Sequence, residues 1–180
     1  MSESHKQLFD AAWVRRAVAD LTQQLLSRPG YFEGTAIVGI RTRGAALAER
    51  LAREVKRQTG IAPPLGALDI TLYRDDLHAT RHLPAVRGTD IAFNVDGKKI
   101  LLIDDVLYTG RTIRAALDEL VDFGRPTWIQ LAVLIDRGCQ ELPIRADYAA
   151  SRIDVPTSQF VRVHLEEVDG VDEVVIIQKD

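Results

Sequence analysis

Short runs of apolar residues alternate along the chain with segments whose apolar residues recur every three or four positions. A continuous apolar run is typical of a strand buried on both faces of a parallel sheet, and the recurring pattern is typical of one helix face. The runs cover residues 35–40, 100–103 and 128–135, and a helical stripe follows each of the first two. This alternation predicts an α/β fold with a doubly wound, mainly parallel sheet flanked by helices.

The remaining segments fit around these units. Asp10 precedes an amphipathic stretch, where it is expected to cap a first helix, and Pro29-Gly30 ends that stretch. Residues 65–73 alternate in polarity and predict a longer strand, and residues 174–177 predict a closing strand. The polar, proline-containing stretch 74–90 is long enough to form a flexible lid loop.

Composition narrows the possible classes of protein. The 180 residues, 46% of them apolar, suffice for one core, so we expect a single domain spanning residues 1–180. The single cysteine, Cys139, excludes an intrachain disulfide framework. No apolar stretch has the length of a membrane span or the pattern of a leader, and a cytoplasmic protein with no membrane partner is therefore expected.

One segment combines a buried strand with groups suited to a phosphorylated sugar. Its apolar run ends in Asp104 and Asp105, and a turn containing Thr109, Gly110 and Thr112 leads into the next helix. The start of a helix offers unpaired N–H groups and the positive end of its dipole, which suits a phosphate. Carboxylates beside it accept hydrogen bonds from a sugar diol and bind hydrated Mg²⁺. The segment therefore predicts a site for a phosphorylated sugar.

A second strand–loop–helix unit repeats this order without the acids. Residues 41–44, Arg-Thr-Arg-Gly, follow the run 35–40, and Arg43 with backbone donors at the helix start suits a second anion. Structural alternatives stay open for each part, since an aspartate near a glycine turn often caps a helix and a single arginine is often a solvated charge. Neither a P-loop nor a G-x-G-x-x-G motif is present.

The acidic pair and the Thr-Gly-x-Thr turn resemble the phosphoribosyl-pyrophosphate (PRPP) signature of type I phosphoribosyltransferases. Further blocks are similar to the PyrR family of pyrimidine-operon attenuation regulators: residues 38–44, 68–77, 104–112, 124–126, 130–138 and 141–148. Together these blocks cover most of the chain from the first helix onward. The resemblance implies a type I phosphoribosyltransferase fold with a small hood at about residues 137–163.

The resemblance also implies roles for individual residues. Thr42 and Arg43 would meet diphosphate, Asp104 and Asp105 would meet ribose, and Arg43 and the two acids would be the catalytic residues. Arg137 and Val161 would form the uracil pocket, with no general base assigned. The remaining substrate-binding residues would be Val106, Leu107 and the 5′-phosphate turn, which comprises Tyr108, Thr109, Gly110, Arg111 and Thr112. Mg²⁺ would arrive with PRPP near the acidic pair, without a directly assigned protein ligand.

The implied function has two halves. One is a uracil phosphoribosyltransferase that converts uracil and PRPP to UMP and diphosphate. The other is a regulator, responsive to UMP or UTP, that binds pyrimidine-operon mRNA; a dimer or higher homo-oligomer is implied. Arginines suited to RNA are Arg15, Arg16, Arg137, Arg145 and Arg152. Cys139-Gln140 stands where the family pattern is more basic, so a phosphoribosyltransferase without an RNA-binding role, or one for another base such as hypoxanthine, remains the alternative.

Overall fold

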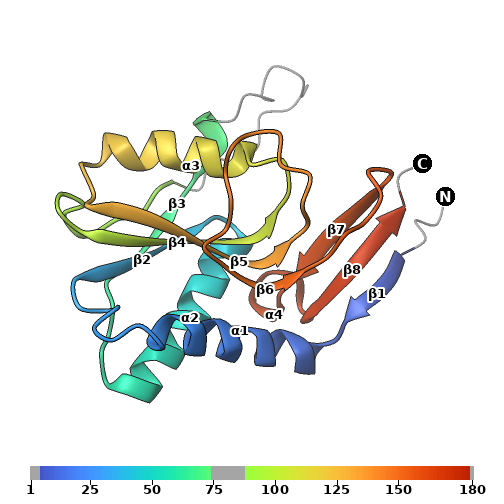
Figure 1. Cartoon of the computed structure of the whole chain (residues 1–180), viewed down its shortest axis with the longest axis horizontal. Helices are drawn as coiled ribbons and strands as arrows, with labels where there is room; N and C mark the ends of the chain where they lie inside the picture. The colour runs from blue at the N-terminus through green and yellow to red at the C-terminus, as the bar shows by residue number, and fades with distance from the viewer. Residues whose placement is uncertain (1–4, 74–87, 179–180) are drawn as a thin grey trace.

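The computed structural model describes residues 5–73 and 88–178 (Figure 1). The strands are β1 (His5–Phe9), β2 (Thr35–Ile40), β3 (Leu65–Leu68), β4 (Lys99–Leu107), β5 (Trp128–Asp136), β6 (Tyr148–Arg152), β7 (Gln159–His164) and β8 (Glu173–Gln178). The helices are α1 (Ala11–Leu26), α2 (Arg43–Thr59), α3 (Arg111–Asp122), the short α4 (Glu166–Asp169) and the 3₁₀-helix η1 (Ile70–Tyr73).

A five-stranded parallel sheet forms the centre of the molecule, with the strand order β3-β2-β4-β5-β6. Helices α1 and α2 cover one face of this sheet and α3 covers the other (Figure 1). From β2 the chain first adds β3 on one side and then β4 on the other, so the strand order reverses between β2 and β4. Ligands bind at such a reversal, outside the carboxyl ends of the strands. The predicted doubly wound α/β fold is confirmed.

The central strand β4 shows why its apolar run is continuous. Ile100 and Leu102 pack into the core beneath α3, whereas Leu101 and Ile103 pack into the core beneath α1 and α2. All four side chains are buried, because helices cover both faces of the sheet. Burial on both faces fixes the direction of this strand and hence the position of the acids at its end.

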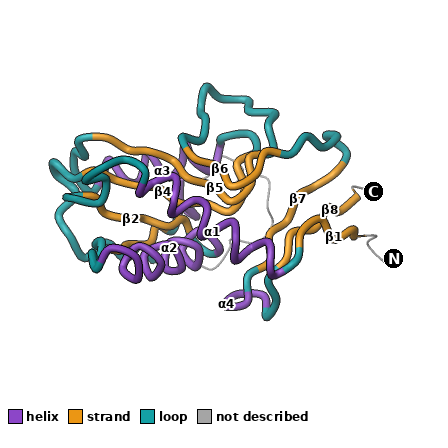
Figure 2. Tube along the Cα trace, turned by 60° about the horizontal axis from the view of Figure 1, so that its bottom comes forward, coloured by secondary structure: helices purple, strands orange, loops and turns teal. Residues whose placement is uncertain are grey.

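A second, antiparallel sheet lies beside the first one. It has the order β1-β8-β7, so the two ends of the described chain lie together (Figure 2). The range 137–163 contributes to both sheets: β6 extends the parallel sheet, and β7 belongs to the small one. The hood boundaries expected from the sequence therefore stay a prediction.

Two predicted strand boundaries are wrong. The strand predicted at residues 65–73 ends at Leu68, and η1 follows it, because the Asp69 carboxylate accepts hydrogen bonds from the backbone N–H and hydroxyl of Thr71. These bonds turn the chain away from the sheet. Strand β4 continues past the acidic pair, since Val106 and Leu107 still pair with β5. Residues 74–87 of the predicted lid loop lie outside the described residues.

Candidate functional site

A cavity of about 260 Å³ lies at the carboxyl ends of β2 and β4, where the strand order reverses. Residues from both predicted loops line it together. They are Ile40, Arg41, Thr42, Arg43, Asp69, Ile70, Thr71, Asp104, Asp105, Val106 and Thr112. The sequence indicated most of these positions, but Asp69 and Thr71 were missed. Their signal was the position of Asp69 directly after the strand that neighbours β2.

Two glycines let the loop after β2 lie against the strands. A Cβ at Gly44 would lie 2.5 Å from the carbonyl oxygen of Ile103 and 3.1 Å from the Cα of Asp104. A Cβ at Gly39 would lie 2.5 Å from the backbone of Ala45. Both contacts are too short for a side chain, so only glycine allows this approach. The close packing places Arg43 beside the acidic pair.

The loop is also tied to its neighbours by hydrogen bonds. Its Arg41–Thr42 peptide bond is cis. The Arg41 backbone N–H donates to the carbonyl of Leu68 at 2.8 Å, and the Arg41 Nε donates to the carbonyl of Gly88 at 2.9 Å. These bonds hold the loop between β3 and the chain that returns at residue 88, and they leave Thr42 facing the cavity with Arg43.

Burial determines the acid–base properties of Asp104 and Asp105. Burial raises the pKa of both carboxyl groups above their ordinary value, and the neighbouring negative charge raises the pKa of Asp104 further. Hydrogen bonding to Asp104 and the Arg43 guanidinium oppose the rise at Asp105. The carboxylates also accept the backbone N–H groups of Asp105 and Val106, both at 2.9 Å. Such a pair gains most from a ligand that brings hydroxyl donors or a cation into the cavity.

The residues present fit Mg²⁺ carried by a substrate. Within residues 5–73 and 88–178, no group of three or more His, Cys, Asp or Glu side chains is placed to hold a metal ion. Mg²⁺ is commonly bound by one or two carboxylates, with phosphate oxygens and water completing its six ligands. Asp104 and Asp105 supply that number of carboxylates at the cavity.

The predicted phosphate turn begins helix α3. Gly110 caps the helix with a φ of 89°, a conformation that favours glycine, and the backbone N–H groups that follow it begin the helix. The carbonyl of Thr109 accepts the N–H groups of Glu141 and Leu142, and Arg111 pairs with Glu141 at 2.9 Å. The turn is therefore fixed from outside by the loop after β5, and Thr112 faces the cavity.

Arg137 and Tyr108 form a buried contact beside this turn. The Arg137 side chain is 2% exposed, and its guanidinium carbon lies 3.8 Å from the centre of the Tyr108 ring. Its Nη2 donates to the carbonyl of Pro156 at 3.0 Å, whereas its Nε has no hydrogen-bond partner in the described part of the chain. A buried guanidinium with an unpaired N–H suits a ligand that brings an acceptor.

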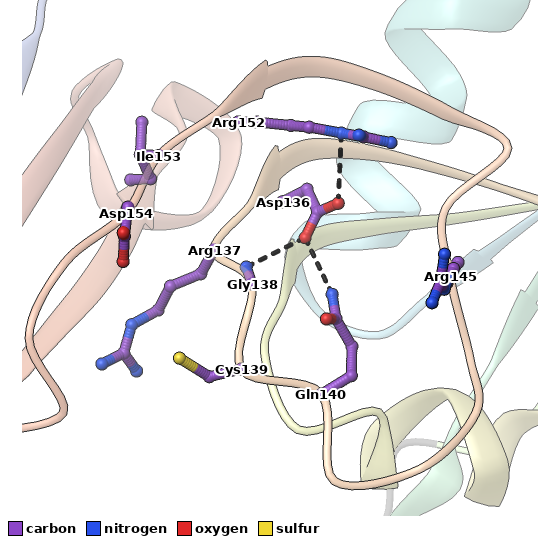
Figure 3. A pocket seen from close by; sticks show the side chains of 9 residues that line it. All are labelled: Asp136, Arg137, Gly138, Cys139, Gln140, Arg145, Arg152, Ile153 and Asp154. Carbon is purple, nitrogen blue, oxygen red and sulfur yellow. Dashed lines mark hydrogen bonds and ion pairs between the residues drawn. The ribbon is translucent and has the colours of Figure 1, made fainter.

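A larger cavity of about 540 Å³ lies next to Arg137 (Figure 3). Its lining residues are Asp136, Arg137, Gly138, Cys139, Gln140, Arg145, Arg152, Ile153 and Asp154. The Asp136 carboxylate organises one wall: it accepts the N–H of Gly138 at 3.0 Å and the amide of Gln140 at 2.9 Å, and it pairs with Arg152 at 3.4 Å. The sequence placed Asp136 at the end of a buried strand but assigned no binding role to Asp136 or Gln140.

The structure separates the predicted RNA-binding arginines into two places. Arg137, Arg145 and Arg152 line the larger cavity, whereas Arg15 borders a groove of about 350 Å³ between α1 and α2. Arg16 is exposed on α1. Val161, half-buried on β7, and Leu107, whose side chain is in the core, line neither of the two site cavities. Of the predicted 5′-phosphate turn only Thr112 lines one; the residues that do not are Tyr108, Thr109, Gly110 and Arg111. The roles of all these residues stay predictions.

None of the helices in the described part of the chain combines the length and the apolar character needed to span a bilayer.

Comparisons with known proteins identify the family of the chain. A family model described as the phosphoribosyl transferase domain matches residues 4–167. A Bifunctional protein PyrR from Pelotomaculum thermopropionicum is 48% identical over 178 residues, covering 99% of this chain and 98% of that protein. One from Chloroflexus aurantiacus is 50% identical over 175 residues, covering 97% of this chain and 96% of that protein.

A solved structure shows the same fold at low identity. A hypoxanthine-guanine phosphoribosyltransferase from Bacillus anthracis superposes with a TM-score of 0.71 at 16% identity, covering 98% of this chain and 99% of that one. The family match over most of the chain and the near-complete relatives at about half identity lead to the same conclusion. The chain belongs to the phosphoribosyl transferase domain family and, within it, to the PyrR family.

Proposed function

We propose that the chain is a bifunctional protein of the PyrR type. It transfers the phosphoribosyl group of PRPP to uracil, giving UMP and diphosphate, and it binds pyrimidine-operon mRNA in response to uridine nucleotides. The observation that carries the enzyme half is the convergence of both anion-binding loops with Asp104 and Asp105 on one cavity. A substrate with a phosphate at one end, a diphosphate at the other and a diol between them matches that arrangement.

Each part of PRPP has a partner in this proposal. The ribose hydroxyls donate to the acidic pair, and the 5′-phosphate accepts the N–H groups at the start of α3. The diphosphate meets Thr42 and Arg43. Asp104 and Asp105 would hold Mg²⁺ that arrives with PRPP, and the ion would supply positive charge to the leaving diphosphate. Burial of the acids and the bonds that fix both loops support this assignment, because binding in a fixed geometry contributes much of the rate in such transfers.

Uracil is proposed to lie between Arg137 and the ribose site. The Nε–H of Arg137, which has no partner in the described part of the chain, can donate to an acceptor, and a pyrimidine carbonyl is one. The stack on Tyr108 holds the guanidinium in place without using its donors. In the transfer, N1 of uracil forms a bond to C1 of the ribose as the bond from C1 to the diphosphate oxygen breaks, and the N1 proton passes to solvent or to a group that we do not assign.

The choice of base separates this proposal from its nearest alternative. We expect product from PRPP and Mg²⁺ with labelled uracil, and none with hypoxanthine or orotate in parallel reactions. Turnover with hypoxanthine in place of uracil would assign the enzyme to a purine base. Preserved UMP binding without turnover of any of the three bases would leave nucleotide sensing as the role of the site.

The RNA half of the proposal rests on the family and on the exposed arginines of the larger cavity. Arg145→Ala is expected to weaken binding of a pyrimidine-leader RNA hairpin by roughly tenfold, since one phosphate or base-edge contact is lost. UMP formation should be unchanged in this variant. The measurement is a gel-shift titration with and without UMP at fixed moderate salt. Equal affinity for a scrambled hairpin would contradict specific RNA recognition.

The assembly state belongs to the same proposal. We propose a homodimer or a higher homo-oligomer, on the strength of the family resemblance alone, and sedimentation velocity measures it directly. A sample that sediments as a monomer across the micromolar range would contradict this part.

A further inference from the structure

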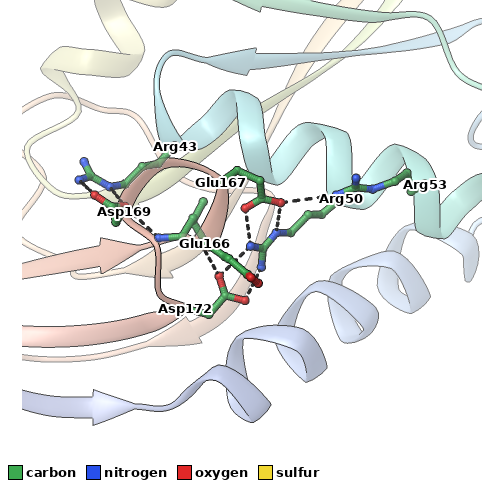
Figure 4. Close-up of polar contacts among 8 residues, drawn as sticks. Arg43, Arg50, Arg53, Glu166, Glu167, Asp169 and Asp172 are labelled. Carbon is green, nitrogen blue, oxygen red and sulfur yellow. Dashed lines mark hydrogen bonds and ion pairs between the residues drawn. The ribbon is translucent and has the colours of Figure 1, made fainter.

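Arg43, the arginine proposed to meet the diphosphate, is held by a residue from the opposite end of the chain. Its Nη2 lies 2.7 Å from Oδ1 of Asp169 and its Nε lies 3.0 Å from Oδ2, so one edge of the guanidinium pairs with both carboxylate oxygens (Figure 4). Asp169 comes from α4, which connects β7 to β8 of the small sheet. Neither the motifs nor the family resemblance drew attention to Asp169.

We propose that Asp169 is a positioning residue that fixes Arg43 for the diphosphate of PRPP. The inference rests on the proposed function, and it deepens that function by linking the small sheet to the diphosphate loop. The role is one of orientation, because Asp169 contacts Arg43 and does not line the cavity itself.

The guanidinium can bind Asp169 and a substrate at once. Arginine has five N–H donors, and the contacts with Asp169 use one on each of two nitrogens. The Arg43 side chain is 30% exposed and lines the cavity, so its other edge is accessible from the site. The hydrogen bonds that Arg43 donates to Asp169 raise the pKa of Arg43, and the same contact lowers the pKa of Asp169. The pair therefore stays ionised at neutral pH.

Asp169 is itself held firmly. Its Oδ2 also accepts the backbone N–H of Leu165 at 2.9 Å. The α4 turn is attached to α2 by Arg50, whose guanidinium donates to both Glu167 and Asp172 at 2.5–2.9 Å (Figure 4). A carboxylate fixed in this way orients the arginine before any ligand arrives, and an arginine without it would lose that restriction.

Two opposite effects follow from removing the carboxylate. Loss of its negative charge would strengthen anion binding, whereas loss of orientation would weaken it. The Asp169 carboxylate is paired with the Arg43 guanidinium and is partly exposed to solvent. At physiological salt, the long-range effect of its charge on the cavity is therefore screened. Restriction of a long side chain acts at every salt concentration. We therefore expect the loss of orientation to dominate.

The test compares Asp169→Asn with Glu166→Gln, a matched control at an exposed residue of the same helical turn, which keeps its backbone N–H bond to Asp172. The probe is inorganic diphosphate with Mg²⁺, titrated by calorimetry at about 150 mM salt. Asp169→Asn should weaken binding by about tenfold. Glu166→Gln should bind as the wild type does.

A kinetic readout separates positioning from general damage. The KM for PRPP should rise in Asp169→Asn while the KM for uracil is unchanged. A smaller folded fraction would lower kcat and leave both KM values unchanged. Diphosphate binding by Asp169→Asn that equals or exceeds that of the wild type overturns the positioning role alone. A wild-type protein that does not bind diphosphate overturns this role and the proposed function together.

Discussion

Asp105→Asn is expected to lower UMP formation more than tenfold without lowering thermal stability. A tenfold loss corresponds to about 1.4 kcal/mol of transition-state stabilisation, which one hydrogen-bonded contact to the ribose can supply. Asparagine keeps an oxygen that accepts the N–H of Val106, so the local backbone is preserved. The removed feature is a buried charge that Arg43 compensates only in part and that the substrate with its Mg²⁺ would compensate further.

The expected effect of Asp105→Asn on thermal stability follows from the direction of the Asp105 pKa shift. Burial raises the pKa of Asp105 in the folded protein above its unfolded value of about 3.9. The folded state therefore binds more protons in the pH window above that value. Stability falls as the pH rises through this window, and the cost persists at neutral pH. Asparagine has no such cost. The Tm of Asp105→Asn at pH 7 should equal or exceed that of the wild type, and the difference should shrink below about pH 4.

The control for this variant is Asp118→Asn. Asp118 pairs with Arg114 on the exposed face of α3, at 2.9 Å, and lines neither site cavity. Both the activity and the Tm should stay close to wild type, because an exposed pair contributes little. Activity near wild type in Asp105→Asn itself would remove this carboxylate from the catalytic account.

Gly44→Ala is expected to have the second large effect, on both stability and activity. Its Cβ would lie 2.5 Å from the Ile103 carbonyl oxygen, so α2 and the diphosphate loop must move away from β4. Alanine favours a helix over glycine by about 1 kcal/mol, but overpacking of this kind costs about 1–3 kcal/mol or more. The clash therefore dominates. We expect a drop in Tm of several degrees and a fall of more than tenfold in PRPP affinity.

Gly60→Ala is the control for Gly44→Ala. It tests whether a loss of PRPP affinity comes from the contact of Gly44 with β4 or would follow from replacing any glycine of α2. Gly60 ends α2 with a φ of 75°, and a Cβ there would meet no atom within 4 Å. Alanine should cost about 1 kcal/mol for the left-handed conformation, with UMP formation unchanged. Differential scanning calorimetry and a PRPP titration measure both variants. Wild-type PRPP affinity in Gly44→Ala would show that the close approach of the loop is unnecessary.

The sequence predicted the elements whose patterns are local. The runs that became β2, β4 and β5 are continuous because helices cover both faces of the sheet, and Asp10 caps α1 by accepting the N–H of Trp13. Strands β1 and β6 were missed. Each is five residues long and is stabilised by a partner strand that its own sequence does not specify. The partner of β1 is β8, and the partner of β6 is β5.

The candidate site also contains residues that local motifs predict and one residue that they do not. Asp104, Asp105 and the two loops carry short motifs, and they lie at the carboxyl ends of neighbouring parallel strands, where residues from all of them line one cavity. Asp169 lies 126 residues from Arg43 and belongs to an acidic stretch with no pattern of its own. Its contact depends on how the small sheet packs beside the large one, and only the folded chain contains that information.

The central claim is that the two loops and the acidic pair form one PRPP site, and competition calorimetry tests it most directly. PRPP with Mg²⁺ should bind once per chain, and inorganic diphosphate and ribose 5-phosphate should each displace it. The two fragments should bind together, because they occupy the two ends of the same cavity. Absence of PRPP binding, or PRPP that either fragment fails to displace, would contradict the account.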